Sequence, residues 1–241
     1  MRSIAFDHIA LAAPRIADAV PFLVGVLGGT PHSGMQGGPE FRFGTWRYDG
    51  GGKLEVIEPV GADGFLHRFL AARGPGIHHV TFKVPSLDEA CDRARARGYE
   101  IVGYDDSYDD WKTAFLHPKQ ALGIVVQFAQ TTESNDPQAW TPPATVANPP
   151  PPVTVVGLRM RASDAERARV QWEEILQGRR VIRTATRVVY RWPDSPMSLF
   201  VDLDRNADDG PVTIELAATR PLELPPGPVP ELGATFRFSQ P

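Results

Sequence analysis

Two histidines, a glutamate and a glutamine stand at matching places in two copies of one sequence pattern. His8 and His79 each open an alternating apolar run that ends at a proline. Glu55 and Gln127 follow them at nearly the same separation, near the end of each copy. Imidazole nitrogen suits zinc, iron, cobalt, nickel and manganese, and hard oxygen ligands complete sites that keep positions open for substrate. The four residues therefore predict a site for one divalent metal ion, provided that the two copies face each other.

The elements that must position these residues can be read from the periodicity of the apolar side chains. Each copy reads as a strand, a helix and then further strands, which predicts an α+β fold. Because side chains alternate along a strand, a histidine on the first strand and an oxygen ligand on the last can face the same side. In the first copy we expect strands at 3–12, 41–47 and 53–57, a helix at 16–27 and a Gly-rich loop. A helix at 64–72 is expected next. In the second copy we expect a strand from 77, a helix at 86–97 and strands at 100–102, 113–116 and 123–128.

The same alternation separates two neighbouring residues from the predicted ligands. His78 is expected on the opposite face of its strand from His79, and Glu58 on the opposite face from Glu55. A lone histidine at a strand start is more often a packed or surface residue than a ligand. The repetition of the pattern is what favours a metal site for His8 and His79.

Residues 131–152 are rich in proline and have the composition of an extended linker. We therefore expect a domain at 1–130, a linker at 131–152 and a third module with a tail at 153–241. In that module Ser163 and Glu166 form a capping-box pattern, and strands continue to about residue 216. Gly157 aligns with His8 and Glu215 with Glu55, so the third module is expected to lack metal and to support a homodimer or cover the first domain.

Composition limits the classes of partner. The formal net charge of -4 and the pI near 5.9 argue against nucleic acid, so a small molecule is the expected partner. The sequence shows no signal-peptide pattern and no apolar run of transmembrane length, which leads us to expect a cytoplasmic protein without membrane contact. Cys91 is the only cysteine and lies in a helical pattern, where a packed thiol is expected.

Four segments of the sequence match a known family. They are Asp7-His8-Ile9-Ala10-Leu11, Leu54-Glu55-Val56-Ile57-Glu58-Pro59, Gly76-Ile77-His78-His79-Val80-Thr81-Phe82 and Gly123-Ile124-Val125-Val126-Gln127. In these segments the chain resembles the vicinal oxygen chelate superfamily, which includes glyoxalase I, methylmalonyl-CoA epimerase, extradiol dioxygenases and bleomycin-resistance proteins. The resemblance implies paired βαβββ modules that form a cupped mixed sheet around a divalent metal, with a third, degenerate βαβββ module here.

The order of the implied ligands differs from both related patterns. It runs His, Gln, His, Glu in the epimerases and His, Glu, His, Glu in bacterial glyoxalase I, whereas this chain reads His8, Glu55, His79, Gln127. The last glutamate of glyoxalase I doubles as its base, and Gln127 stands there. The epimerases carry another glutamate base on the strand equivalent to 41–46, where the nearest residue here is Arg42 or Phe43. Glu55 remains as the expected catalytic base.

The expected function is a metal-dependent lyase or isomerase that chelates vicinal oxygens of a small carbonyl or acyl-CoA substrate. Its metal would be zinc, cobalt, nickel, manganese or iron. Two alternatives stay open. One is ring cleavage at Fe(II) by two histidines and one carboxylate, and the other is a ligand-binding or resistance protein of the same fold without turnover.

Overall fold

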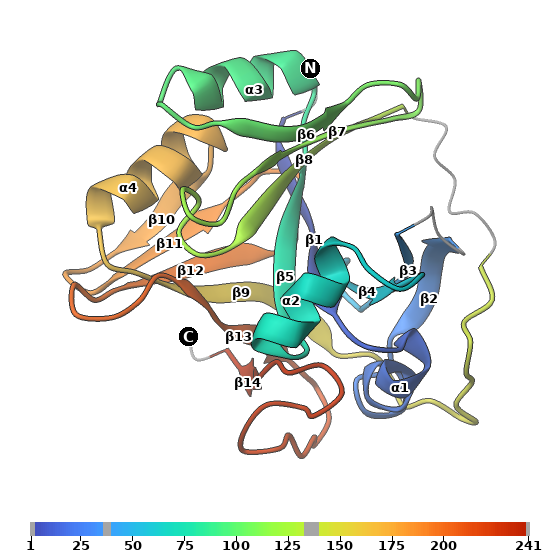
Figure 1. The fold of residues 1–241 in the computed structure, drawn as a ribbon. Helices are drawn as coiled ribbons and strands as arrows, with labels where there is room; N and C mark the ends of the chain where they lie inside the picture. The colour runs from blue at the N-terminus through green and yellow to red at the C-terminus, as the bar shows by residue number, and fades with distance from the viewer. Residues whose placement is uncertain (1–2, 36–39, 133–139, 240–241) are drawn as a thin grey trace. The chain divides into compact units, whose positions relative to one another are not determined.

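A computed structural model describes residues 3–35, 40–132 and 140–239 (Figure 1). Its strands form two mixed sheets, of order β2-β3-β4-β1-β5-β8-β7-β6 and β10-β11-β12-β9-β13-β14. The strands are β1 (Ala5–Ala12), β2 (Thr30–Met35), β3 (Phe41–Arg47), β4 (Lys53–Pro59), β5 (Gly76–Lys83), β6 (Ile101–Asp105), β7 (Trp111–Leu116), β8 (Val125–Thr131), β9 (Thr154–Ala162), β10 (Arg179–Arg183), β11 (Arg187–Arg191), β12 (Ser198–Leu203), β13 (Gly210–Ala217) and β14 (Phe236–Phe238). The helices are α1 (Ile16–Val20), α2 (Phe65–Arg73), α3 (Leu87–Arg95) and α4 (Ala165–Arg169), with π-helical segments η1 (Pro21–Val26) and η2 (Val170–Ile175).

One pairing rule recurs three times along the chain. The first strand of each module pairs in parallel with the last: β1 with β4, β5 with β8 and β9 with β12. The two middle strands are antiparallel neighbours of that last strand, in the orders β2-β3-β4, β6-β7-β8 and β10-β11-β12. This is the βαβββ module predicted from the sequence, and the third copy is present. The α+β fold with three such modules is confirmed.

The alignment of Glu215 with Glu55 is wrong. Glu55 lies opposite Ala10, two residues after His8. The corresponding residue two positions after Gly157 is Arg159, and it lies opposite Phe200 on β12. Glu215 lies instead on β13, a later strand that the local pattern of apolar residues could not distinguish from the last strand of the module. The third module thus has neither histidine nor carboxylate at these two places.

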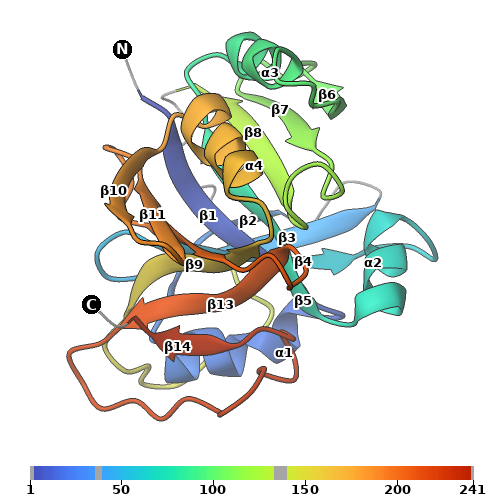
Figure 2. The same cartoon turned by 90° about the vertical axis from the view of Figure 1, so that its left-hand side faces the viewer.

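The chain divides into two compact units. The first comprises Met1–His8, His79–Asn135 and Gly157–Val212. Within it α3 packs on β7 and β8 and also contacts η2, and Figure 2 shows α3 lying along β6 and β7. Apolar side chains fill this interior, including the stacked rings of Phe6 and Phe82 and the edge of Trp192. Cys91 is buried on α3 as predicted, and burial raises the pKa of its thiol to about 11.

The second unit comprises Ile9–His78, Asp136–Val156 and Thr213–Pro241, and in it α1 and α2 both pack against β4. Glu58 is buried and accepts hydrogen bonds from the backbone N–H of Ile16 at 2.6 Å and from Arg42. It thereby satisfies one of the free N–H groups at the start of α1.

The ring of Trp140 packs against Gly34 and Gly44. Only glycine fits at these two positions, because a Cβ at either would lie within 2.5 Å of the indole.

The predicted elements differ from the observed ones in several places. β2 was not predicted, since a Gly-rich loop was expected between the helix at 16–27 and the strand at 41–47. The cap of α4 is Asp164, whose carboxylate accepts from the N–H groups of Glu166 and Arg167, rather than Ser163. Residues 133–139 of the predicted linker lie outside the described residues, and the division at 130 and 153 stays a prediction. None of the helices in the described segments is long and apolar enough to span a membrane.

Candidate metal centre

His8 lies on β1 in the first unit and is almost fully buried. Its Nδ1 lies 2.8 Å from Oδ2 of Asp7, so the ring donates its Nδ1 proton to a carboxylate. Lys83 adds a positive charge with its Nζ 3.6 Å from the other oxygen of Asp7. A carboxylate at one ring nitrogen fixes the tautomer and directs the second nitrogen, Nε2, toward a ligand. Asp7 thus leaves Nε2 of His8 as the ring nitrogen that could accept a ligand.

His79 lies on β5 in the same unit and is also buried. The centroids of the His8 and His79 rings are 5.9 Å apart, with an interplanar angle of 71°. Strand alternation turns Thr81 to the same face as His79. The hydroxyl of Thr81 lies 2.9 Å from Nε2 of His8, so β1 and β5 bring both histidines and this hydroxyl into one buried polar cluster.

Gln127 joins this cluster from β8. It lies opposite Thr81 in the parallel pairing, and the Thr81 hydroxyl donates to its Oε1 at 2.7 Å. Its Nε2 donates to Oγ1 of Thr113 at 2.9 Å, and the Thr113 hydroxyl donates to the carbonyl of Phe128. These bonds fix the amide with its oxygen on the Thr81 hydroxyl, the same hydroxyl that contacts Nε2 of His8.

Glu55 lies on β4 in the second unit and is buried. The Thr45 hydroxyl donates to its Oε2 at 3.4 Å from the opposite position on β3. The same face of β3 carries Phe43, opposite Ile57, whereas Arg42 lies opposite Glu58. The described part of β3 therefore offers no carboxylate on the Glu55 face.

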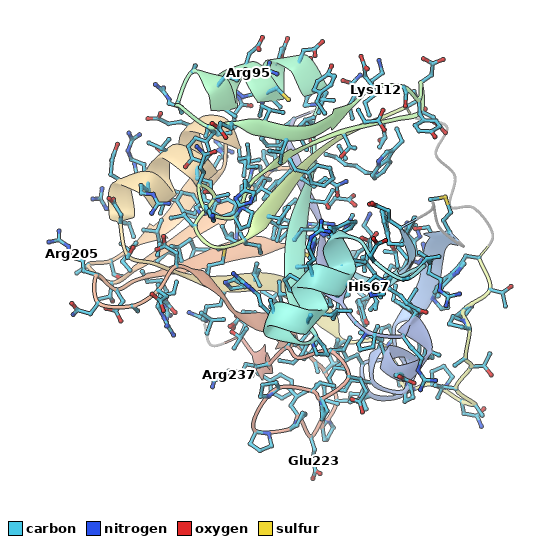
Figure 3. All side chains as sticks on the ribbon, viewed as in Figure 1. His67, Arg95, Lys112, Arg205, Glu223 and Arg237 are labelled. Atoms are coloured by element: carbon cyan, nitrogen blue, oxygen red, sulfur yellow. The ribbon has the colours of Figure 1, made fainter. Side chains whose placement is uncertain are left out.

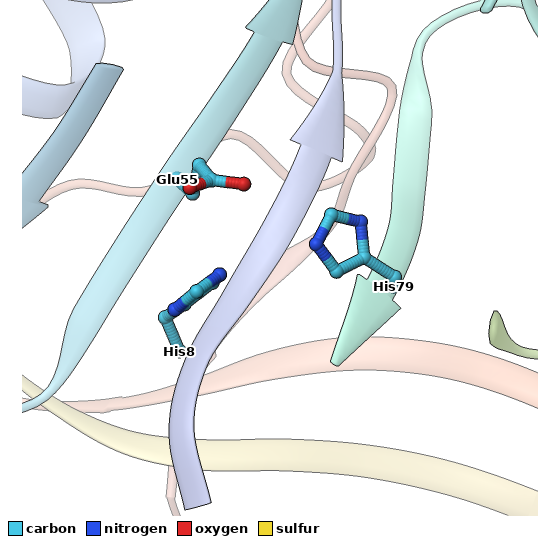
Figure 4. Close-up of side chains that lie close together, drawn as sticks. All are labelled: His8, Glu55 and His79. Atoms are coloured by element: carbon cyan, nitrogen blue, oxygen red, sulfur yellow. The ribbon is translucent and has the colours of Figure 1, made fainter. Parts of the chain in front are cut away.

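His8, Glu55 and His79 each offer a ligand atom, and these atoms lie within 4.8 Å of one another (Figure 4). No other group of three histidine, cysteine, aspartate or glutamate residues meets this condition within 3–35, 40–132 and 140–239. Two imidazoles and a carboxylate are a donor set that divalent transition metals accept. A buried carboxylate also needs compensating charge, which a cation supplies. The residues present fit a divalent metal ion.

His78 does not belong to this group of three. Its ring packs against Phe65 and Phe69 of α2, with centroids 5.6 Å and 4.9 Å away. Burial lowers the pKa of His78 to about 4, although the charge of Glu55 acts in the opposite direction. The residue is a packed neighbour of the α2 aromatics rather than a side chain on the outer surface.

Three supporting residues besides Thr113 were not predicted from the sequence. Asp7, Thr81 and Thr45 hold His8, Gln127 and Glu55 through hydrogen bonds. Asp7 directly precedes His8, and Thr81 follows His79 by one alternation, so both stand inside the segments that were singled out. Their proximity in the sequence was the available signal, but the bonds themselves depend on strand pairing.

Residues 7–115 match the sequence model of the Glyoxalase/Bleomycin resistance protein/Dioxygenase superfamily. The chain is 29% identical over 127 residues to the uncharacterized protein YqjC of Bacillus subtilis, with 52% of this chain and 90% of that protein covered. It is 28% identical over 131 residues to an ethylmalonyl-CoA/methylmalonyl-CoA epimerase of Cereibacter sphaeroides, with coverage of 52% and 96%.

A solved structure extends the similarity of fold beyond the first two modules. A triple mutant of 4-hydroxymandelate synthase from Streptomyces coelicolor matches with a TM-score of 0.64 at 14% sequence identity. The match covers 90% of this chain and 71% of that one, and at this identity it shows the fold alone. Residues 7–115, somewhat less than half of the chain, are therefore similar in sequence to the glyoxalase/bleomycin resistance protein/dioxygenase superfamily, and the rest of the chain is similar in fold alone.

Proposed function

We propose that this chain binds one divalent metal ion through His8, Glu55, His79 and Gln127 and catalyses proton transfer beside the carbonyl of a small carbonyl or acyl-CoA substrate. The observation that carries the proposal is the group of three buried ligand atoms from His8, Glu55 and His79 within 4.8 Å of one another. The acyl-CoA class rests on the similarity to the epimerase of Cereibacter sphaeroides. The products would be those of an isomerase or a lyase.

The chain's own residues supply positioning and the base. Asp7 holds the His8 ring through Nδ1, and Thr81 and Thr113 hold the amide of Gln127. A divalent ion bound there would act as a Lewis acid that stabilises negative charge on substrate oxygens. The side-chain amide of Gln127 cannot accept a proton from carbon, whereas a carboxylate can. Glu55 is therefore the proposed base.

The proposal is tested by exchange of the substrate proton with solvent. Methylmalonyl-CoA is incubated with metal-loaded protein in deuterium oxide, and deuterium at C2 is followed by mass spectrometry. Glu55→Gln is expected to lose this exchange while it retains metal. Gln127→Glu, which replaces an amide with a carboxylate at another proposed ligand, is also expected to keep metal. Exchange at the wild-type rate in Glu55→Gln would exclude Glu55 as the base.

The same data distinguish the alternative without turnover. A ligand-binding or resistance protein would bind a carbonyl ligand with measurable heat but would leave its α-proton unexchanged. That result in the wild-type protein, with metal bound, would replace the enzymatic proposal with a binding one.

Ring cleavage at Fe(II) is a second candidate function, favoured by one observation. The cluster consists of two histidines and one carboxylate, the facial donor set of non-haem Fe(II) oxygenases. Protein loaded with Fe(II) under anaerobic conditions and then mixed with a catechol and oxygen would consume oxygen if this candidate is correct. Loss of oxygen uptake in Glu55→Gln is expected, because the carboxylate completes the donor set.

The homodimer, the cytoplasmic location and the identity of the metal are also proposals. The third module has neither a histidine nor an oxygen ligand at the Gly157 and Phe200 positions. We therefore propose that this module serves assembly of a homodimer rather than chemistry. Its role in assembly can be examined by measuring the mass of the full chain in solution.

A further inference from the structure

The first unit carries two edge strands with exposed apolar side chains. One strand belongs to an acidic hairpin and the other to a basic hairpin. β6 ends the order of the eight-stranded sheet, and β10 begins that of the six-stranded sheet. Most of the large apolar side chains that are exposed in the described segments lie on these two hairpins. The exposed set is Met35, Val102, Tyr104, Tyr108, Val181, Ile182 and Phe238.

The acidic hairpin comprises residues 101–116, from β6 through β7. Its turn reads Tyr-Asp-Asp-Ser-Tyr-Asp-Asp at 104–110, with four aspartates, and every residue of that turn is exposed. Asp105 accepts hydrogen bonds from the N–H and the hydroxyl of Ser107, which hold the turn in shape. Asp106 and Asp109 make no ion pair within the described part of the chain. Lys112, labelled in Figure 3, is the single basic residue of this hairpin.

The basic hairpin comprises residues 179–191, from β10 through β11. It contains five arginines and no acidic residue. All of β10 is exposed, including Val181 at 47% and Ile182 at 50%. Arg180 pairs with Glu173. Arg179 and Arg183 have no ion-pair partner among the residues that the structure describes, so two guanidinium groups flank an exposed apolar pair.

We propose that the basic hairpin of one copy of this chain binds the acidic hairpin of a second copy. The arginines of the basic hairpin and the aspartates of the acidic hairpin have complementary charges. A contact between two basic hairpins would instead place five arginines of one copy against five of the other, which is unfavourable. Arginine pairs with carboxylates through two parallel hydrogen bonds, and the exposed tyrosines of one hairpin offer apolar surface to the Val181 and Ile182 side chains of the other. The proposal goes beyond the metal chemistry and does not depend on it.

The contact uses side chains rather than strand addition. The pairing of β6 with β7 shifts register between Val102 and Asp105, and that of β10 with β11 shifts between Arg180 and Ile182. Irregularities of this kind twist an edge away from further backbone pairing. Because the two contacting surfaces differ, the copies either close as a pair with two such contacts or continue as an open chain.

Sedimentation velocity of the full chain tests the contact. At about 0.05 M salt the mass is expected to exceed the 26.4 kDa of one chain, and at about 0.5 M it is expected to fall toward that value, because salt screens exposed charges. A wild-type mass of 26.4 kDa under both conditions overturns the proposal.

Charge reversal locates the surface. Arg179→Glu with Arg183→Glu, and separately Asp106→Lys with Asp109→Lys, should each reduce the mass to that of one chain at low salt. An equimolar mixture of the two double variants should restore the association, since the reversed hairpins complement each other. The matched control reverses Arg68 and Arg73, two exposed arginines of α2, and should behave as wild type.

Circular dichroism and thermal melting establish that the variants are folded before their masses are compared. Association that persists in both double variants, or a mixture that stays at the mass of one chain, overturns the assignment of these hairpins.

Discussion

The hydroxyl oxygen of Thr81 lies 2.9 Å from Nε2 of His8, the nitrogen that the Asp7 carboxylate leaves for a ligand. The same hydroxyl donates to Oε1 of Gln127 at 2.7 Å. One threonine therefore links a histidine of the first module to the amide of the second. A metal that binds to Nε2 of His8 would compete with the Thr81 hydroxyl for this nitrogen. We therefore expect Thr81 to affect both the stability of the protein and its affinity for metal.

Replacing Thr81 with Val removes the hydroxyl but nearly preserves the volume of the side chain. Loss of a buried hydrogen-bond donor is expected to lower the free energy of unfolding of the metal-free protein by about 1–3 kcal/mol. Urea unfolding measures this change. Thr81→Ser keeps the hydroxyl and should lose less, and equal losses in the two variants would show that packing, rather than the hydrogen bonds, matters at this position.

Replacing Asp7 with Asn removes the negative charge that faces Nδ1 of His8. Outer partners of metal-binding histidines contribute roughly 10–100-fold to metal affinity, and a loss of that size is expected. Competition with a chromogenic chelator measures the affinity. Asp18→Asn, which disrupts only an exposed pair with Arg15, is the control and should bind metal as wild type does. Equal affinity in the Asp7 and Asp18 variants would contradict the role given to Asp7.

Glu58 and Glu55 lie on the same strand but are expected to respond differently to the same change. Glu58→Gln weakens the bonds to the Ile16 N–H and to Arg42 and should lower the free energy of unfolding by about 1–3 kcal/mol. It should leave metal affinity unchanged, because Glu58 is not in the group of three ligands. Thermal melting and metal titration of both variants check this, and metal loss in Glu58→Gln would place Glu58 in the site.

Burial raises the pKa of the Cys91 thiol from 9.0 to about 11. Between these pH values the unfolded chain releases the thiol proton while the folded chain retains it, so the thiol's contribution to stability is present below pH 9 and declines as pH rises toward 11. The difference in unfolding free energy between wild type and Cys91→Ala should therefore narrow over that range, by about 2–3 kcal/mol at most. Urea unfolding at a series of pH values tests this, and a constant difference would contradict it.

The proposed ligand residues could be singled out from the sequence because their signals are local. A histidine and an oxygen ligand repeat in two copies, and strand alternation places them without any knowledge of the tertiary contacts. The hydrogen bonds that hold them could not be predicted in the same way. Thr81 reaches His8 across 73 residues of sequence, and that contact exists only once β1 and β5 have taken their places.

The elements that were missed depend on pairing. β2 contains Pro31 and Gly34 and lacks an alternating apolar pattern, so its strand conformation comes from its hydrogen bonds to β3. Glu215 has a local pattern that resembles the Glu55 strand, but β9 pairs with β12, and this long-range pairing removes Glu215 from the position of Glu55.

The metal content of two histidine variants tests most directly whether His8, Glu55 and His79 hold a metal ion. Wild type, His79→Ala and His78→Ala are purified in parallel without added metal, and metal per chain is measured by elemental mass spectrometry. Wild type should contain close to one divalent ion, His79→Ala almost none, and His78→Ala most of the wild-type amount. Metal retained by His79→Ala, or lost equally from both variants, would contradict the claim.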